Sequence, residues 1–202
     1  MKIFYIMGKS ASGKDTIFNI LKDKFNMNTY IMYTTRTIRE GEEDGKTYHY
    51  ISNQEMQKYI EGKMPNELIE QRTYHTIYGD WTYATIRDNQ FNNEKDMLMI
   101  GTLESYNKIK EKMQEKMKPI YIEVEDGLRL ERAIKREQLE EKPKYEELCR
   151  RFLADSKDFS EENIKKAGIK KRFQNIKLNE CVKEISNYII SEKQRIEEIE
   201  RE

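Results

Sequence analysis

The sequence predicts an α/β fold in which a mainly parallel sheet is flanked by helices. Short apolar runs rich in β-forming residues alternate with segments whose apolar residues recur at helical spacing. A glycine-bearing segment joins the first of these strands to the first helix. The chain has 202 residues, of which 37% are hydrophobic, including 13 Tyr and 7 Phe. That is enough apolar material to build the core of one ordinary domain.

The first predicted elements are a strand, a glycine loop and a helix. Residues 2–7 form an apolar run that ends at Gly8, which predicts a buried strand. From Lys14 onward, apolar residues fall at helical spacing, which predicts a helix. Residues 29–33 and 48–51 are rich in Tyr and Ile and predict a second and a third strand.

The middle of the chain continues the alternation. Ser52 and Glu55 form a capping-box pattern, so we expect a short helix that ends near Gly62. Residues 96–100 predict another buried strand, and residues 101–117 predict the helix that follows it.

The last third of the chain is highly charged. Residues 119–124 predict a strand, and Pro143 separates two predicted helices over residues 128–139 and 145–159. A last short strand is expected at residues 173–176, before a helix that runs from Cys181 to the end. Repeated alternation of strands and helices favours parallel pairing.

Charge and cysteine content exclude several classes of protein. Lys+Arg and Asp+Glu each number 37, so no excess of positive charge favours nucleic acid or an anionic membrane. Cys149 and Cys181 lack the spacing of a zinc site or disulfide framework. The sequence has no secretory signal pattern and no apolar run of the roughly 20 residues that cross a bilayer. We expect a soluble cytoplasmic protein.

Residues 8–14, called the phosphate loop below, fit the pattern G-x-x-x-x-G-K between a strand and a helix. Two glycines let the backbone curl until its N–H groups point at phosphate oxygens, and the helix start adds a partial positive charge. The lysine brings a full charge to the β- and γ-phosphates. The residues expected to bind ATP here are Gly8, Ser10, Ala11, Ser12, Gly13, Lys14, Asp15 and Thr16.

The residue after Lys14 departs from this pattern. Ser or Thr normally stands there and binds Mg²⁺, whereas this chain has Asp15 followed by Thr16. A carboxylate can ligate Mg²⁺, and metal ligation by Asp15 is the interpretation that we favour. The alternative is that Asp15 only complements the positive start of the helix. Thr16 points about 100° further round the helix and is a weaker substitute.

Residues 34–50 carry a second cluster of polar side chains. Arg36 and Arg39 suit bidentate recognition of a phosphate or carboxylate. Tyr48 has a hydroxyl to donate to the same anion. The competing interpretation is structural, with Arg36 and Glu42 forming a surface ion pair and Tyr48 serving as a strand residue.

This segment resembles the guanylate kinase family, which carries T-T-R-x-x-R-x-G-E-x-x-G-x-x-Y-x-F at this place. Residues 34–50 match that motif, with Tyr50 in place of the usual Phe. Residues 68–70 match a Phe-Ile-Glu-like element, and Tyr78 with Gly79 matches the family's Tyr-Gly. The resemblance extends over essentially the whole chain and thins after Gly79.

The resemblance implies a nucleoside monophosphate kinase with a phosphate-loop fold, which moves the γ-phosphoryl of ATP to GMP with Mg²⁺. Arg36, Arg39, Tyr48 and Tyr78 would hold the GMP phosphate. Glu70 would accept hydrogen bonds from the N1–H and exocyclic amine of guanine. The full set implied to bind GMP is Thr34, Arg36, Arg39, Glu42, Tyr48, Glu70, Tyr78 and Thr102.

The family also has a lid with the pattern L-x-x-R-x-x-x-R and a second basic site on the next helix. Arg132 and Arg136 match the first pattern, and Arg150 and Arg151 follow. We favour Arg136 and Arg151 as catalytic, with Arg150 left open. Such arginines would balance charge on the transferred phosphoryl group. Asn175 resembles an asparagine near the adenine site, and with Arg132 joins the expected ATP-binding set.

The resemblance divides the chain into three parts. The core would comprise residues 1–31, 85–125 and 166–202, with an acceptor-binding insert at 32–84 and a helical lid at 126–165. Catalysis would rest on Lys14, Arg36, Arg39, Arg136 and Arg151. The expected partners are ATP and GMP, without nucleic acid or membrane, in a monomer or homodimer serving purine nucleotide metabolism.

The base-reading residues depart from the family pattern. The family has D-x-D-x-Q-G after the strand at 96–100, whereas both aspartates are missing from residues 100–105. Thr102 is expected at the base-reading place, and the family's guanine-contacting serine appears as Met32 or Tyr33. His75 and Trp81 flank the expected acceptor site, where they either contact a base or simply pack in a loop.

Phosphorylation of another nucleoside monophosphate stays open as an alternative, and so do two other functions. A phosphate loop ending in G-K-D also resembles ribose-bisphosphate kinases, which phosphorylate a sugar phosphate but lack the full motif of residues 34–50. The guanylate-kinase-like interaction module binds phosphopeptides without catalysis. Such modules typically lose the loop lysine, whereas Lys14 is present here.

Overall fold

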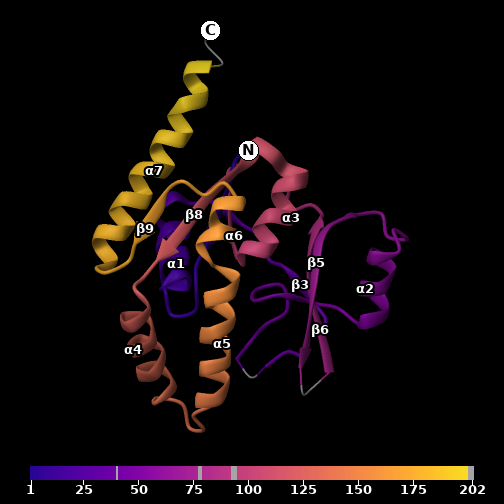
Figure 1. Cartoon of the computed structure of the whole chain (residues 1–202). Helices are drawn as coiled ribbons and strands as arrows, with labels where there is room; N and C mark the ends of the chain where they lie inside the picture. Colours follow the sequence, from indigo (N-terminus) through magenta and orange to yellow (C-terminus); the bar gives the residue numbers. More distant parts are fainter. Residues whose placement is uncertain (40, 77–78, 92–94, 200–202) are drawn as a thin grey trace.

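A five-stranded parallel sheet forms the centre of the protein (Figure 1). The structure, a computed structural model, describes residues 1–39, 41–76, 79–91 and 95–199. The strands of this sheet are β1 (Ile3–Met7), β2 (Asn28–Thr29), β7 (Met97–Gly101), β8 (Met117–Glu123) and β9 (Arg172–Gln174). They stand in the order β2-β7-β1-β8-β9, and all neighbours are parallel. The predicted α/β fold with a mainly parallel sheet is confirmed.

Helices cover both faces of this sheet. The helices of the described residues are α1 (Lys14–Phe25), α2 (Asn53–Ile60), α3 (Leu103–Met113), α4 (Asp126–Glu137), α5 (Tyr145–Asp158), α6 (Glu161–Lys166) and α7 (Leu178–Ile199). Alternate residues of β1 point to opposite faces, so Tyr5 lies in the core beside α3 and α6 while Phe4 lies in the core beside α1 and α7. Because both faces are covered, β1 is apolar throughout.

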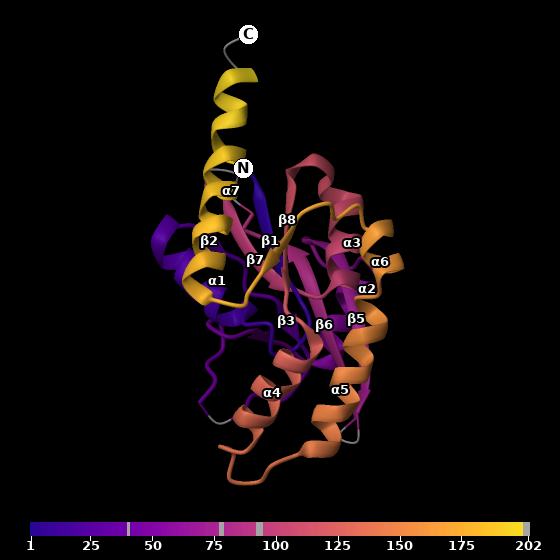
Figure 2. The ribbon, with the colours of Figure 1, turned by 60° about the vertical axis from the view of Figure 1, so that its left-hand side comes forward.

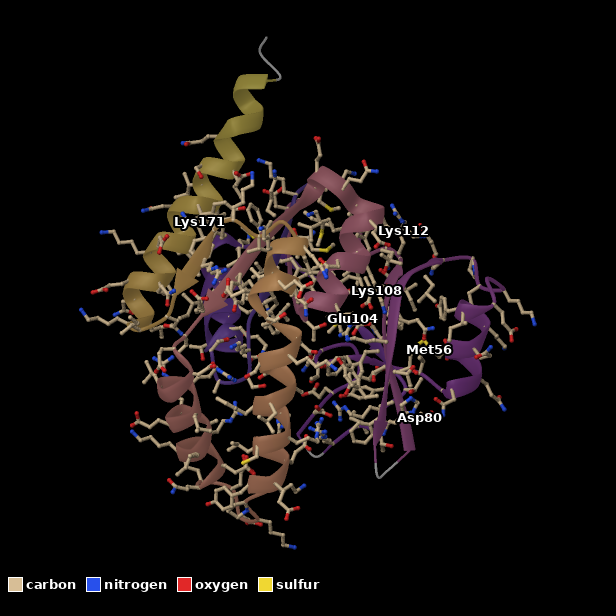
Figure 3. All side chains as sticks on the ribbon, viewed as in Figure 1. Met56, Asp80, Glu104, Lys108, Lys112 and Lys171 are labelled. Atoms are coloured by element: carbon tan, nitrogen blue, oxygen red, sulfur yellow. The ribbon has the colours of Figure 1, made fainter. Side chains whose placement is uncertain are left out.

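A smaller mixed sheet is built from residues between α1 and β7. Its strands are β3 (Tyr33–Thr34), β4 (His49–Tyr50), β5 (Glu67–Thr76) and β6 (Gly79–Arg87), in the order β4-β3-β6-β5. Helix α2 packs on it through Met56 and Tyr59, against Ala84 and Ile86 (Figure 3). The hydroxyl oxygen of Ser52 accepts the backbone N–H of Glu55, as the capping-box pattern predicts.

The single strand predicted over residues 29–33 is wrong. The chain passes there from one sheet to the other, so Thr29 belongs to β2 and Tyr33 to β3. Between them the backbone N–H of Ile31 donates to the Gln90 side chain at 2.8 Å rather than to a strand. Tyr30 anchors the crossing, because its buried hydroxyl bonds to the backbone of Ile86.

Three further elements differ from the sequence-based expectation. The long hairpin of β5 and β6 and the short helix α6 were not predicted. The helix expected over residues 101–117 ends earlier, because Gln114 has a φ of 45° and a 3-10 turn covers Gln114–Lys116. Among the described residues, no helix has both the length and the apolar character needed to cross a membrane.

The carboxyl ends of four central strands meet at one edge of the sheet. Gly8, Thr102, Val124 and Asn175 each follow the strand that ends there. In open parallel sheets, ligands bind at this edge. Helices α4 and α5 lie beside each other at the end of the molecule away from the last turns of α7 (Figure 2). The fold therefore brings these two helices next to the phosphate loop.

Replacing Ile185 with Ala should destabilise the protein by about 2–5 kcal/mol, because this fully buried side chain joins α7 to the sheet. The matched change Ile190→Ala, at a side chain that is 43% exposed on the same helix, should cost roughly 1 kcal/mol or less. Denaturant-induced unfolding of both variants measures the difference. Equal costs would contradict this account of the α7 interface.

Candidate functional site

The phosphate loop connects β1 to α1, and its two glycines sit where no side chain fits. A Cβ at Gly8 would lie 2.5 Å from the carbonyl oxygen of Ile122 and 2.8 Å from the hydroxyl of Ser12. Gly13 has a φ of 83°, and a Cβ there would lie 2.4 Å from Nδ2 of Asn175. The loop therefore closes tightly against the neighbouring strand ends, as the glycine pattern requires.

Asn175 lies behind the loop. Its Nδ2 donates to the carbonyl oxygen of Ser12 at 2.8 Å, and both side chains are buried. The Oδ1 of Asn175 and the hydroxyl of Ser12 are buried without a hydrogen-bond partner. In this position Asn175 holds the loop backbone in place.

Lys14 and Asp15 stand on the first turn of α1. The Lys14 Nζ lies 3.4 Å from Oδ2 of Asp15, whose side chain is 77% exposed. Thr16 is also exposed, and Ala11 takes a positive φ of 61° inside the loop. The Asp15 carboxylate is therefore open to solvent, whereas Lys14 is 24% exposed and pairs with it.

A Mg²⁺ ion that accompanies a nucleotide is held by one or two carboxylates together with phosphates and water. Within the described ranges, no three His, Cys, Asp or Glu side chains gather as a metal site. A nucleotide-bound Mg²⁺ needs only one or two protein carboxylates, and the exposed carboxylate of Asp15, beside Lys14, can supply one.

Helices α4 and α5 are joined to the phosphate loop by residues that sequence reasoning missed. The backbone N–H of Ser10 donates to Asp155 of α5 at 2.6 Å. Arg129 of α4 donates to the carbonyl oxygen of Ser10 and to Asp155, each at 3.3 Å. Arg129 is 1% exposed and also pairs with Asp126, while its guanidinium lies 4.1 Å from the ring centroid of Phe152. The sequence offers one indication that Arg129 is buried, which is that it lies four residues before the buried Ala133 and so shares its helix face.

The predicted lid arginines lie around the same point. Arg136 and Arg151 line a small cavity of about 20 Å³ together with Ser10. Arg150 instead makes two hydrogen bonds to Glu147, at 2.6 and 2.8 Å. Arg132 donates to the carbonyl oxygen of Ile176, next to Asn175. Arg151 also pairs with Glu147, at 3.2 Å, so both arginines of α5 contact this carboxylate and only Arg151 lines the cavity beside Ser10 as well.

The motif at residues 34–50 folds into a cluster around Arg36, which is only 4% exposed. Its guanidinium donates to both oxygens of Glu42, at 2.8 and 2.9 Å, and lies over the rings of Tyr48 and Tyr50. The hydrogen bonds from Arg36, with further ones from the Arg39 N–H and the Tyr50 hydroxyl, lower the pKa of Glu42 to about 2. The ion pair of the structural alternative therefore forms, with Arg36 buried and Glu42 19% exposed.

The other residues predicted to bind the acceptor phosphate are either more exposed than Arg36 or already hydrogen-bonded within the protein. Arg39 is exposed, and its guanidinium lies 5.8 Å from the ring centroid of Trp81. The buried Thr34 hydroxyl donates to the carbonyl oxygen of Thr82. Burial raises the pKa of Tyr48. Tyr78 lies outside the described residues.

Glu70 sits inside the protein at the other end of the insert. Its Oε1 accepts hydrogen bonds from Arg72 at 2.7 Å, Ser105 at 2.8 Å and Thr85 at 3.0 Å. The hydroxyl oxygen of Thr102 accepts the backbone N–H of Ser105 and so caps α3. Arg72 and Ser105 were not predicted, because neither belongs to the motifs that carry the resemblance.

Two lysines of α3 contact β5, the strand that carries Glu70. Lys108 donates to the carbonyl oxygen of Gln71 at 2.8 Å, and Lys112 pairs with Glu67 at 2.7 Å. Figure 3 shows Glu104, Lys108 and Lys112 along α3, next to β5. His75 pairs with Asp80 at 2.7 Å near the exposed end of the hairpin, where both side chains are more than half exposed.

Comparisons with known proteins agree with the motifs. The sequence model of the guanylate kinase family matches residues 1–195. The guanylate kinase of Campylobacter jejuni (strain RM1221) is 32% identical over 138 residues, which cover 66% of this chain and 65% of that protein. The guanylate kinase of Thermotoga maritima is 33% identical over 100 residues, covering 48% of this chain and 46% of that protein. The chain thus spans slightly less than two thirds of the first curated relatives.

A solved structure shows the same fold. The crystal structure of guanylate kinase from Anaplasma phagocytophilum superimposes with a TM-score of 0.62 at 23% sequence identity. The match covers 95% of this chain and 86% of that chain.

Arg129→Ala should cost about 3 kcal/mol of stability, because it removes a buried cation from two carboxylates and from the phosphate loop. Arg150→Ala, at a side chain that is 66% exposed, should change stability by no more than about 0.5 kcal/mol. Urea unfolding of the two variants and the wild type provides the measurement. A loss of stability below about 1 kcal/mol for Arg129→Ala would show that the contacts of Arg129 do not hold α4 and α5 on the phosphate loop.

Glu42→Gln should destabilise the protein at neutral pH, and its effect should fade in acid. The pKa of Glu42 is about 2 in the folded protein against an ordinary 4.5, so the unfolded chain takes up a proton first as the pH falls. The stability from Glu42 is therefore fully present above about pH 4.5 and is lost towards pH 2. Unfolding measured from pH 7 to pH 3 should show the gap narrowing. Glu43→Gln, at an exposed neighbour, is the control, and a gap independent of pH would refute the account.

Proposed function

The chain belongs to the guanylate kinase family, and on that premise we propose that it transfers the γ-phosphoryl group of ATP to GMP, giving ADP and GDP. The observation that carries the proposal is the phosphate loop, whose two glycines have no room for a Cβ and which leads into Lys14 at the start of α1. A loop built in this way binds phosphates with its backbone N–H groups.

On the donor side, the loop would hold the β- and γ-phosphates of ATP, and Lys14 would balance their charge. Arg132 and Asn175 would lie towards the adenine end. Asp15 would contribute to binding Mg²⁺, which when bound neutralises charge on the β- and γ-phosphates. Arg136 and Arg151 would approach the transferred group from the lid, where they already lie beside Ser10.

On the acceptor side, Arg36, Arg39 and Tyr48 would hold the phosphate of GMP, with Glu42 keeping Arg36 in position. In the family pattern Tyr78 and Thr34 join them. An oxygen of the acceptor phosphate attacks the γ-phosphorus in line, a new P–O bond forms, and the bond to the β-phosphate oxygen breaks as ADP leaves. That oxygen is already ionised, so the enzyme needs no strong general base.

At the other end of the acceptor, Glu70 would contact the base and Thr102 would lie near it. The proposal includes the predicted division into a core at residues 1–31, 85–125 and 166–202, an insert at 32–84 and a lid at 126–165. Closure of lid and insert would exclude water, which would otherwise accept the phosphoryl group. The proposal also includes the cytoplasmic location that the sequence predicts.

Lys14→Ala should lower kcat by roughly 100-fold or more while leaving the fold intact, because it removes a positive charge from the phosphates in the transition state. A coupled assay for ADP formation with ATP, Mg²⁺ and GMP measures the loss, and circular dichroism checks the fold. Lys22→Ala, at an exposed lysine on the same helix, serves as the control. Unchanged turnover in Lys14→Ala would refute the role of the loop.

The same assay with a panel of acceptors tests the proposed function itself. GMP should be phosphorylated in preference to AMP and to ribose bisphosphate. Turnover of ribose bisphosphate alone would favour the sugar-phosphate alternative. Binding of a phosphopeptide with no phosphoryl transfer to any acceptor would favour a non-catalytic module.

A further inference from the structure

Arg129 of α4 and Asp155 of α5 meet at the backbone of Ser10 in the phosphate loop. Oδ2 of Asp155 accepts the N–H of Ser10 at 2.6 Å and also accepts Nη1 of Arg129 at 3.3 Å. The same Nη1 donates to the carbonyl oxygen of Ser10, again at 3.3 Å. Both polar backbone atoms of one loop residue are therefore held, each from a different helix. We call Ser10, Arg129 and Asp155 the Ser10 clasp.

The Ser10 clasp is built around a buried charge. Arg129 is 1% exposed, and the side chain of Asp155 is 18% exposed. The Nε and Nη2 of Arg129 donate to Oδ1 of Asp126 at 3.1 and 3.0 Å, and the ring of Phe152 packs against the guanidinium. An apolar pair of similar volume would usually be as stable as a buried ion pair. What the ion pair adds is direction, because hydrogen bonds fix each helix at one point of the loop.

The clasp lies at the ends of α4 and α5 that adjoin the phosphate loop. Arg129 is in the first turn of α4, and Asp155 is in the last turn of α5. Residues 138–144, which connect the two helices, lie at their other end (Figure 1). The clasp therefore fixes both helices at the point where they reach the loop.

Two arginines that we propose to act on the transferred phosphoryl group stand on the same helix faces as the clasp. Arg151 precedes Asp155 by four residues on α5, and Arg136 follows Arg129 by seven residues on α4. Residues at these spacings share one face of a helix. Both arginines line the cavity of about 20 Å³ to which Ser10 and Arg129 also contribute. A shift of either helix at the clasp would therefore move these arginines relative to the loop.

The clasp residues themselves are poorly placed to contact a phosphate. Asp155 carries a negative charge, which repels phosphate oxygens. Arg129 lies between Asp126 and Asp155, so two carboxylates offset its charge. In contrast, Arg136 and Arg151 are both exposed. The two helices thus carry one pair of residues that holds them to the loop and another pair that stays accessible.

We propose that Arg129 and Asp155 are positioning residues for phosphoryl transfer, which hold Arg136 and Arg151 at the phosphate loop through the Ser10 clasp. This inference rests on the proposed kinase function and adds two residues to it. Because a misplacement of about 1 Å can cost a factor of about 100 in rate, loss of the clasp should lower kcat by roughly 100-fold. The residues proposed to bind GMP lie outside α4 and α5, so KM for GMP should change by less than about threefold.

Asp155→Leu and Asp155→Asn give the first test, because the two new side chains have similar volumes and differ in the acceptor atom. Leucine removes both hydrogen bonds to Oδ2 and should lower kcat by roughly 100-fold in the assay with ATP, Mg²⁺ and GMP. Since Oδ2 alone makes these two bonds, the amide oxygen of asparagine can replace it and should keep kcat within about fivefold. Glu146→Leu, which removes an exposed carboxylate from α5, is the control and should leave kcat unchanged.

Turnover of Asp155→Leu within about threefold of the wild type would overturn the inference and leave the kinase function in place. If Asp155→Leu does not fold, the double variant Arg129→Met with Asp155→Leu replaces the ion pair by apolar side chains of similar volume, which buried sites usually tolerate. This variant also lacks the clasp, so the same loss of kcat is expected and the same outcome overturns the inference. If the wild-type protein phosphorylates no monophosphate, the proposed function fails and the inference fails with it.

Combination with arginine variants separates positioning from a general effect on the fold. In a protein that carries Arg136→Ala and Arg151→Ala, the clasp has no arginine left to place. Adding Asp155→Leu should then lower kcat by less than about threefold, against roughly 100-fold in the wild-type background. A loss of about 100-fold in both backgrounds would show that Asp155 acts in another way and would overturn the inference. An unchanged kcat in the arginine double variant would overturn it as well.

Discussion

The close seating of the phosphate loop on the strand ends is the constraint on which the rest of the site depends. A Cβ at Gly8 would lie only 2.5 Å from the carbonyl oxygen of Ile122, so the loop packs directly against β8. The side chain of Asn175 donates a hydrogen bond to the loop carbonyl of Ser12. Because the loop is fixed to β8 and β9, the start of α1 and the position of Lys14 are fixed as well. The same loop carries Ser10, to which Arg129 and Asp155 join helices α4 and α5. One segment of backbone thus sets the positions of both Lys14 and these two helices.

The formal net charge of zero conceals an ordered arrangement of charge inside the protein. In the described part of the chain, three buried arginines each have a carboxylate partner: Arg36 with Glu42, Arg72 with Glu70 and Arg129 with Asp155. The first pair lies in the segment 34–50, the second lies on β5, and the third joins α4 to α5. A buried arginine without its acid would be strongly destabilising. The carboxylates therefore hold the buried arginines in position. A phosphate that binds near one of these arginines would find its charge already balanced by a carboxylate.

Much of this fold could be predicted because it is local. The strand, loop and helix at the N-terminus follow from apolar spacing and two glycines, and the Ser52 cap follows from a four-residue pattern. The hairpin of β5 and β6 could not, since β-pairing depends on contacts across the sheet and the strands carry many polar residues. Likewise, Arg72 and Arg129 look like ordinary surface charges in the sequence. Only the tertiary structure shows that both are buried and that each touches a predicted site residue.

The segments proposed to bind the acceptor match the family motif at residues 34–50 and depart from it at residues 100–105. The phosphate end is a closed local cluster in which Arg36, Glu42 and Tyr50 satisfy one another. The proposed base end is assembled from distant segments, with Tyr5 from β1, Gly101 at the end of β7 and Glu70 from β5. A Cβ at Gly101 would lie 2.0 Å from the hydroxyl oxygen of Tyr5, so a side chain there requires Tyr5 to move. The space at position 101 therefore depends on the residue at position 5, whereas the side-chain hydrogen bonds of Arg36 stay within residues 36–50.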